Sequence, residues 1–272
     1  MYEWWIAVII GIVEGLTEFL PVSSTGHMIL AGHALGFKGD KAETFEIVIQ
    51  LGAILAVTVI YWKRIIPLFT MLMPNSKERG KRKMNLLHVL IAITPALLLA
   101  FILRDFIKGV LFSPETVVIG LILGGIFMIV AERGKQRTTA IDIDELTYKQ
   151  TFMIGLSQCL SIWPGFSRSG ATIAGGMMAG ASRAAAADFT FIIAIPVMVA
   201  ATGYELLTSI GVFTADDLLF LAIGFIVSFV VALLAVITFI KLVQRLTLTY
   251  FSYYRFALAA VVLLYMIFIG FE

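Results

Sequence analysis

Long apolar stretches separated by short polar segments recur along the whole chain. A helix needs about 20 apolar residues to cross the hydrocarbon core of a bilayer. Stretches close to this length predict six transmembrane helices, at residues 42–62, 84–104, 115–132, 184–207, 216–240 and 250–270. They leave no room for a sizeable soluble domain, so we expect one membrane domain over residues 1–272.

Two further stretches, residues 2–36 and 148–180, are apolar but broken midway, by Pro21 and by Pro164-Gly165. Proline ends a helix, and the serines that follow each break can cap the next one. Irregular backbone at membrane depth is tolerated only where it is buried in protein or lines a wet cavity. We therefore predict an all-α fold with six transmembrane helices plus two re-entrant helical hairpins, and a site at the two breaks.

The two halves of the chain are related by an offset of 144 residues, as between Ser23 and Ser167. Glycine and serine positions match in the two broken stretches, and Glu14 is paired with the similar residue Gln158. We predict an internal repeat, with repeat 1 at about 1–135 and repeat 2 at about 145–272. A hairpin followed by three spans inverts the second copy, which is inverted-repeat topology.

Composition agrees with a membrane protein, since 60% of the residues are hydrophobic and 14% are charged, with a mean hydropathy of +0.98. The net charge of +2 gives no reason to expect nucleic acid. The single cysteine, Cys159, excludes an internal disulfide and a cysteine-based metal cluster. Residues 1–5 lack the basic start of a secretory signal, so we expect the N-terminus to be retained.

The distribution of Lys and Arg predicts the orientation, because cytoplasmic loops carry the excess. Basic residues gather after the first, third and fifth spans, and few lie in the intervening loops. The N-terminus and the first hairpin should therefore face outside, and the second hairpin should open to the cytoplasm. Charged residues near predicted span ends are expected to be snorkelling anchors; these are Glu132, Arg183, Glu205 and Arg255.

The first broken stretch carries Glu14 and Glu18, which are four residues apart and so share one helix face. Two like charges inside a membrane are costly unless something positive lies between them. A divalent cation or a basic partner is implied, and oxygen ligands favour Mg²⁺ or Ca²⁺. The alternative is an interfacial pair that faces headgroup water.

Hydroxyls and a histidine follow in the same stretch. Ser23, Ser24 and Thr25 stand at a helix start, where free N–H groups and the helix dipole favour an anion. His27 lies within about one turn of them and is a candidate general acid, base or nucleophile. A buried histidine bonded to a neighbouring carbonyl is the structural alternative.

The second broken stretch places Arg168 among hydroxyls at another helix start. Its planar guanidinium matches a phosphate group, and the neighbouring candidates for substrate binding are Ser167, Ser169 and Thr172. An arginine inside a membrane is a functional candidate by default. The alternative is a structural ion pair with Glu14 or Glu18, and the two roles are compatible.

The segment from Glu14 to His27, which contains Pro-Val-Ser-Ser-Thr-Gly-His, and the later Pro-Gly-Phe-Ser-Arg-Ser-Gly-Ala-Thr resemble the two signatures of bacterial undecaprenyl pyrophosphate phosphatases, the enzymes linked to bacitracin resistance. The resemblance covers essentially the whole chain. It implies a multi-pass enzyme of the bacterial cytoplasmic (inner) membrane that removes the terminal phosphate of a polyprenyl pyrophosphate lipid and recycles the carrier for cell-wall synthesis.

The resemblance also implies roles for the candidate residues. Glu14 and Glu18 would bind the metal or activate the nucleophile, Ser24 or His27 would attack, and Arg168 would hold the pyrophosphate. The hydroxyls of the second signature would add donors. The sequence leaves the oligomeric state open, including a homo-oligomer.

Two other functions compete with this interpretation. Inverted repeats with broken helices also build transporters, which would use Arg168 to bind phosphate or a lipid carrier. A type-2 phosphatidic acid phosphatase is a weaker alternative, because that family resembles a scheme with a second catalytic histidine and this chain has none after Arg168. A P-loop ATPase is excluded, because the Gly-x4-Gly-Lys-Ser/Thr motif does not occur.

Overall fold

The computed structural model describes residues 3–70, 84–103, 106–111, 113–134, 136–208, 217–243 and 245–268. This part of the chain is helical, with a single isolated bridge between Ala140 and Ala181. The α-helices are α1 (Trp4–Thr17), α2 (Ser24–Ala34), α3 (Asp40–Thr70), α4 (Leu86–Ile102), α6 (Pro114–Arg133), α7 (Tyr148–Leu160), α8 (Arg168–Met178), α9 (Arg183–Thr208), α10 (Leu218–Leu242) and α11 (Leu248–Phe268). Two short helices, Ile107–Leu111 and Ile143–Glu145, lie between them.

Five helices of the described part are long and apolar enough to cross a membrane, so the chain is a multi-pass membrane protein. The candidate spans are Thr44–Leu68, Pro114–Arg133, Arg183–Tyr204, Leu218–Leu242 and Leu248–Phe268, and each overlaps a predicted one. The predicted span at 84–104 corresponds to α4, which has 17 residues and contains Pro95. At 1.5 Å per residue, α4 is about 25 Å long, slightly less than the hydrocarbon core.

The predicted break in each of the two stretches is confirmed. The first stretch forms α1 and α2 with a turn between them, and the second forms α7 and α8. Ser23 and Ser167 are the N-caps of α2 and α8, and their side chains accept hydrogen bonds from the backbone N–H of Gly26 and Gly170. The expected capping by serine is therefore observed at both breaks.

Both capping serines have a strained backbone. Their φ angles are 70° for Ser23 and 73° for Ser167, in a region that residues with a side chain rarely adopt. Such a conformation costs about 1–3 kcal/mol and is typical of functional sites. The two breaks are thus alike in position, in capping and in backbone strain.

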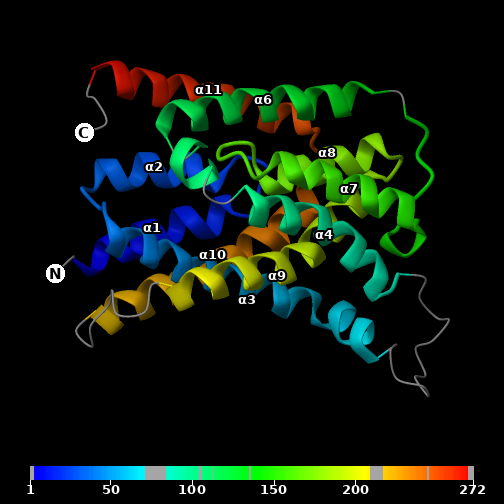
Figure 1. Cartoon of the computed structure of the whole chain (residues 1–272), viewed down its shortest axis with the longest axis horizontal. Helices are drawn as coiled ribbons and strands as arrows, with labels where there is room; N and C mark the ends of the chain where they lie inside the picture. Colours follow the sequence, from blue (N-terminus) through cyan, green and yellow to red (C-terminus); the bar gives the residue numbers. More distant parts are fainter. Residues whose placement is uncertain are drawn as a thin grey trace.

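The two helix pairs lie toward opposite ends of the molecule (Figure 1). Pair α1 and α2 lies toward the end that holds both termini, and pair α7 and α8 toward the other end. Helix α10 packs against α1 and α3, and α9 packs against α3 and α8. The largest hydrophobic core is built mainly from α3, α4 and α9, with buried residues of α6, α7, α8, α10 and α11. Helices α6 and α11 pack along each other on one side.

Small residues let the broken helices approach the long ones. A Cβ added at Gly15 of α1 would lie 2.8 Å from the Ser228 carbonyl oxygen of α10, so any larger residue would push the two helices apart. Close approach at small residues is the usual basis of helix packing in membranes. The packing holds the turn after α1 in the interior, where Phe19 is fully buried.

Candidate active site

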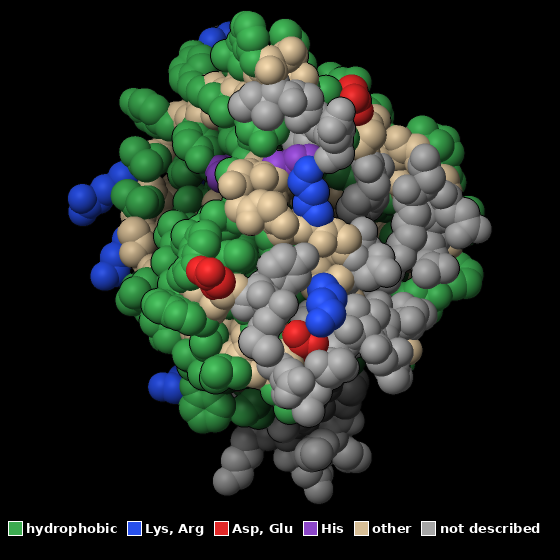
Figure 2. All heavy atoms as spheres, turned by 90° about the vertical axis from the view of Figure 1, so that its left-hand side faces the viewer, with side chains coloured by type: hydrophobic (Ala, Val, Ile, Leu, Met, Phe, Trp, Pro, Cys, Tyr) green, Lys and Arg blue, Asp and Glu red, His purple; other side chains and the backbone are tan. Residues whose placement is uncertain are grey.

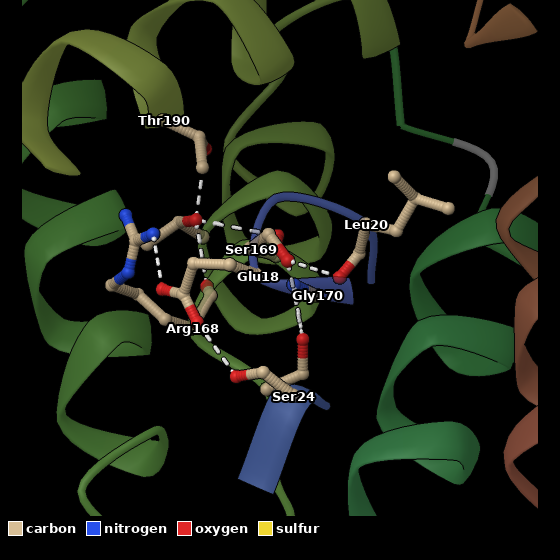
Figure 3. A network of polar contacts seen from close by, with 9 residues as sticks. Glu18, Leu20, Ser24, Arg168, Ser169, Gly170 and Thr190 are labelled. Atoms are coloured by element: carbon tan, nitrogen blue, oxygen red, sulfur yellow. Dashed lines mark hydrogen bonds and ion pairs between the residues drawn. The ribbon is translucent and has the colours of Figure 1, made fainter. Parts of the chain in front are cut away.

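The two breaks meet through a buried ion pair (Figure 3). Arg168, the first residue of α8, donates through Nη2 to Glu18 Oε1 at 3.1 Å. Both side chains are largely buried, at 13% and 10% exposure. The arginine also lies over the Phe19 ring, with Cζ 5.8 Å from the ring centroid. The basic partner that the acidic pair requires is therefore present in the chain itself.

Ser24 is bound to the same carboxylate. Its hydroxyl donates to Glu18 Oε2 at 2.6 Å, so one carboxylate joins the start of α2 to the start of α8. A serine hydroxyl that donates to a carboxylate has the arrangement of a nucleophile with its base. The arginine beside this carboxylate supplies the positive charge that a phosphate would meet.

Hydroxyl groups near the start of α8 hold Arg168 in this arrangement. Ser169 donates to the Leu20 carbonyl at 2.9 Å and lies 3.2 Å from the Ser167 hydroxyl, which ties α8 to the turn of the first hairpin. Thr172 donates to the Arg168 carbonyl at 2.8 Å and accepts from Thr190 of α9, also at 2.8 Å. These predicted substrate-binding residues fix the position of Arg168 in the structure.

His27 lies on α2 with both ring nitrogens engaged. Nδ1 is 2.8 Å from the Ser23 carbonyl oxygen, and Nε2 is 2.6 Å from the Tyr254 hydroxyl. Because a carbonyl oxygen only accepts, Nδ1 carries hydrogen, and the Nε2 of the neutral ring accepts from the tyrosine. The histidine bonded to a neighbouring carbonyl is thus the arrangement observed. Thr25 is half-buried on α2.

Glu14 is almost fully buried, at 1% exposure, and its Oε1 has no hydrogen-bond partner among the described residues. It lies within electrostatic reach of Glu18, Glu46 and Arg168. A buried oxygen without a donor is costly unless a ligand supplies one. In the described part of the chain no group of three or more His, Cys, Asp or Glu is placed to hold a metal.

Arg255 is not the snorkelling anchor that the sequence suggested. It is fully buried on α11 and donates to the carbonyls of Gly165 at 2.7 Å and Phe166 at 2.8 Å. It also donates to Gly120 and Leu121 of α6. The predicted span began at residue 250, whereas α11 begins at Leu248 and Arg255 faces the interior two turns along. Arg255 thus fixes the loop that leads into Arg168.

We expect Arg255→Met to lower the free energy of unfolding by about 3 kcal/mol or more, because four buried carbonyls would each lose a donor. The thermal midpoint of purified protein in detergent measures this loss. Phosphate release should fall as well, since the loop before Arg168 loses its support. Leu264→Ala, at an exposed position of the same helix, is the control, and an unchanged midpoint for Arg255→Met would contradict the role.

The other predicted anchors are ion-paired or lie outside the described residues. Arg183 pairs with Glu132 and donates to the Val243 carbonyl at 3.3 Å. Glu132 also accepts from the backbone N–H of Leu248 at 2.9 Å. These contacts join α6, α9 and α11, which is a structural role. The side chain of Glu205 lies outside the described residues.

The end of the molecule that holds both termini carries apolar side chains around its edge, with histidine, basic and acidic side chains between them (Figure 2). This is the end toward which α1 and α2 lie.

Two residues of the site, Tyr254 and Arg255, were missed in the sequence analysis. The signal was a run of polar residues, Ser252 to Arg255, inside an apolar segment.

Comparison with known proteins finds relatives that match nearly the whole chain. A family described as "Bacitracin resistance protein BacA" matches residues 7–261. "Undecaprenyl-diphosphatase 1" of Bacillus thuringiensis (strain Al Hakam) is 53% identical over 254 residues, which cover 93% of this chain and 95% of the relative. The proteins of the same name from Bacillus anthracis and Bacillus cereus are 53% and 52% identical, covering 93% and 96% of this chain and 94% and 98% of the relatives.

Proposed function

Because the chain belongs to the bacitracin resistance protein BacA family, we propose that it is a membrane phosphatase acting on undecaprenyl diphosphate. It converts this lipid to undecaprenyl phosphate and inorganic phosphate, and so recycles the carrier for cell-wall synthesis. The observation that carries the proposal is the bridge from Ser24 through Glu18 to Arg168. This bridge places the Ser24 hydroxyl, a carboxylate base and a phosphate-binding guanidinium next to one another in the protein interior.

The mechanism follows from these contacts. Glu18 accepts the Ser24 proton while Ser24 Oγ attacks the terminal phosphorus, and undecaprenyl phosphate leaves. Water then cleaves the phosphoserine, which releases inorganic phosphate and restores the serine. Arg168 Nη2 already binds Glu18. The buried Nη1 of the same guanidinium has no partner among the described residues, so it is available to a phosphate oxygen. Phosphoryl transfer depends mostly on such positioning and charge stabilisation.

His27 takes a supporting role in this proposal. Its ring is held by the Ser23 carbonyl and the Tyr254 hydroxyl, which leaves Ser24 as the better nucleophile. The remaining hydroxyl groups lie at or near the two helix starts, where backbone N–H groups favour an anion. They belong to Ser23, Thr25, Ser167, Ser169 and Thr172.

A divalent cation, Mg²⁺ or Ca²⁺, fits the residues present. The unpartnered Oε1 of Glu14 is a hard oxygen ligand, and Glu18 lies within its electrostatic reach. Such ions are commonly held by one or two carboxylates together with substrate phosphate and water. Bound there, the ion would neutralise charge on the diphosphate.

Chelation of divalent cations with EDTA is expected to lower phosphate release by about 10²-fold or more, because a bound ion contributes several kcal/mol of charge stabilisation. Added Mg²⁺ or Ca²⁺ should restore the rate, and Glu14→Gln should raise the concentration required. Release of phosphate is measured after dialysis against the chelator. A full rate in the chelated protein would rule out the metal role of Glu14 and Glu18.

The proposed architecture has six transmembrane helices, with α4 as the sixth, and two re-entrant hairpins in an inverted repeat. The matching breaks and caps at Ser23 and Ser167 support it. The proposed location is the bacterial cytoplasmic membrane, with the N-terminus and the cleft facing outside, as the distribution of Lys and Arg favours. A homo-oligomer stays a prediction.

The test is release of inorganic phosphate from undecaprenyl diphosphate by purified protein in detergent. The wild type should release phosphate and form undecaprenyl phosphate. A transporter of phosphate or of the lipid carrier, the alternative function, would release none in detergent. It would instead move its substrate across reconstituted vesicles, so flux without hydrolysis would overturn the proposal.

A further inference from the structure

Buried polar atoms without a partner gather on the two broken stretches. Among the described residues, five buried side-chain atoms lack a hydrogen-bond partner. One is Arg183 Nε, and the other four belong to Glu14, Arg168 and Gln158. Glu14 and Arg168 already have roles in the proposed site, whereas Gln158 has none.

Gln158 has more unpartnered side-chain atoms than any of the other three residues. The residue is 1% exposed, and both Oε1 and Nε2 lack a partner within the described part of the chain. Proteins usually satisfy buried amides, and a buried unsatisfied amide destabilises the fold relative to an apolar residue of the same size. A group of this kind is expected where a ligand supplies the missing bonds.

The position of Gln158 points toward the proposed site. It belongs to the buried face of α7, together with Thr151, Ile154 and Gly155. That helix packs against α8, and the small residues of α8 show the register. A Cβ at Gly176 would contact Ile154, and one at Gly175 would contact Ser157.

Gln158 lies four residues after Ile154, on the same buried face of α7 and one turn nearer the break that leads to Arg168. In the first hairpin the equivalent position, offset by 144 residues, is Glu14. The amide and the carboxylate therefore occupy matching places on the two helices that lead into the breaks.

We propose that Gln158 is a substrate-binding residue whose amide Nε2 donates a hydrogen bond to a phosphate oxygen of the diphosphate headgroup. The inference rests on the proposed function, since it assigns a further ligand in that site. An amide suits the task because it donates to an anion without adding another charge beside Arg168. It also explains why a buried amide is retained where an apolar residue would be more stable.

The experiment compares Gln158→Met with the wild type in two measurements on protein purified in detergent. One is the KM and kcat of phosphate release from farnesyl diphosphate, a short polyprenyl probe. The other is the thermal midpoint, with and without that probe. Methionine has a similar length and no amide, so the midpoint of the free protein should rise or stay unchanged, while KM should rise about tenfold or more. The stabilisation by farnesyl diphosphate should shrink.

Gln158→Leu is the second variant, because a branched apolar side chain fills the buried site with a different shape and tests the same loss of the amide if methionine packs poorly. It also lacks the donor, so KM should again rise. Gln150→Met is the matched control on the same helix. Gln150 is also buried, but its amide donates to Thr139 at 3.0 Å and to the Ala179 carbonyl at 3.2 Å. Gln150→Met should therefore lower the midpoint and leave KM unchanged.

Unchanged KM and unchanged stabilisation by the probe in both Gln158 variants would overturn the inference. Failure of the proposed function looks different. A wild type that is stabilised by farnesyl diphosphate but releases no phosphate contradicts the hydrolase, and the thermal measurement still tests Gln158. A wild type that shows neither effect contradicts both.

Discussion

Replacing Arg168 with alanine is expected to lower phosphate release by about 10³-fold or more. An arginine that stabilises a transferring phosphoryl group contributes about 10³ to 10⁵ in rate. Arg168 is placed for this task, since its Nη2 binds Glu18 and its Nη1 is buried without a partner among the described residues. The variant loses the cation and also leaves the Glu18 carboxylate buried without its partner, which disturbs the base.

Arg168→Lys separates the charge from the geometry of the side chain. Lysine keeps the positive charge but cannot hold Glu18 and a phosphate through one planar fork, so it should recover only a small part of the rate. Arg245→Ala, at an exposed position before α11, is the control and should keep the wild-type rate. Assays are run well below the thermal midpoint of each variant, so that unfolding does not mimic lost catalysis. If Arg168→Ala keeps the wild-type kcat and KM, the arginine has no part in catalysis and serves only in the ion pair with Glu18.

The local pattern of the sequence was enough to predict the two breaks and the helix starts. Proline removes a backbone donor, and serine supplies a cap within three residues, so both effects act within one turn. The same argument located Ser24 and Arg168 at helix starts. The direct ion pair between Arg168 and Glu18 was only one of two alternatives, because 150 residues separate the partners and sequence alone does not place them together.

Prediction from the sequence failed at residues whose contacts are set by packing between distant segments rather than by the local sequence pattern. Arg255 looked like an interfacial anchor, because an arginine near the start of an apolar span usually reaches for water. Its four acceptors are carbonyls of distant segments, which only the folded arrangement brings together. Tyr254 was missed for the same reason, since its contact with His27 joins residues 227 positions apart. Helix α4 is shorter than its predicted span within the described residues.

Ser24→Ala is expected to lower phosphate release by about 10⁴-fold or more, because removal of a nucleophile leaves only binding and charge stabilisation. The structure distinguishes this serine from its rival. Ser24 Oγ donates to Glu18 at 2.6 Å, whereas both nitrogens of His27 are held by other groups. The rate is measured under saturating farnesyl diphosphate, where a loss of binding does not contribute.

His27→Ala provides the comparison that decides between the two nucleophiles. If Ser24 attacks, His27→Ala should lose clearly less than Ser24→Ala, since it removes only a neighbour of the helix start. Tyr254→Phe should then have a small effect, because it removes only the hydroxyl that holds the histidine ring. Acid-stable phosphate on the protein, found in the wild type and missing in Ser24→Ala, identifies phosphoserine. Acid-labile phosphate that persists in Ser24→Ala and disappears in His27→Ala would instead assign the attack to the histidine.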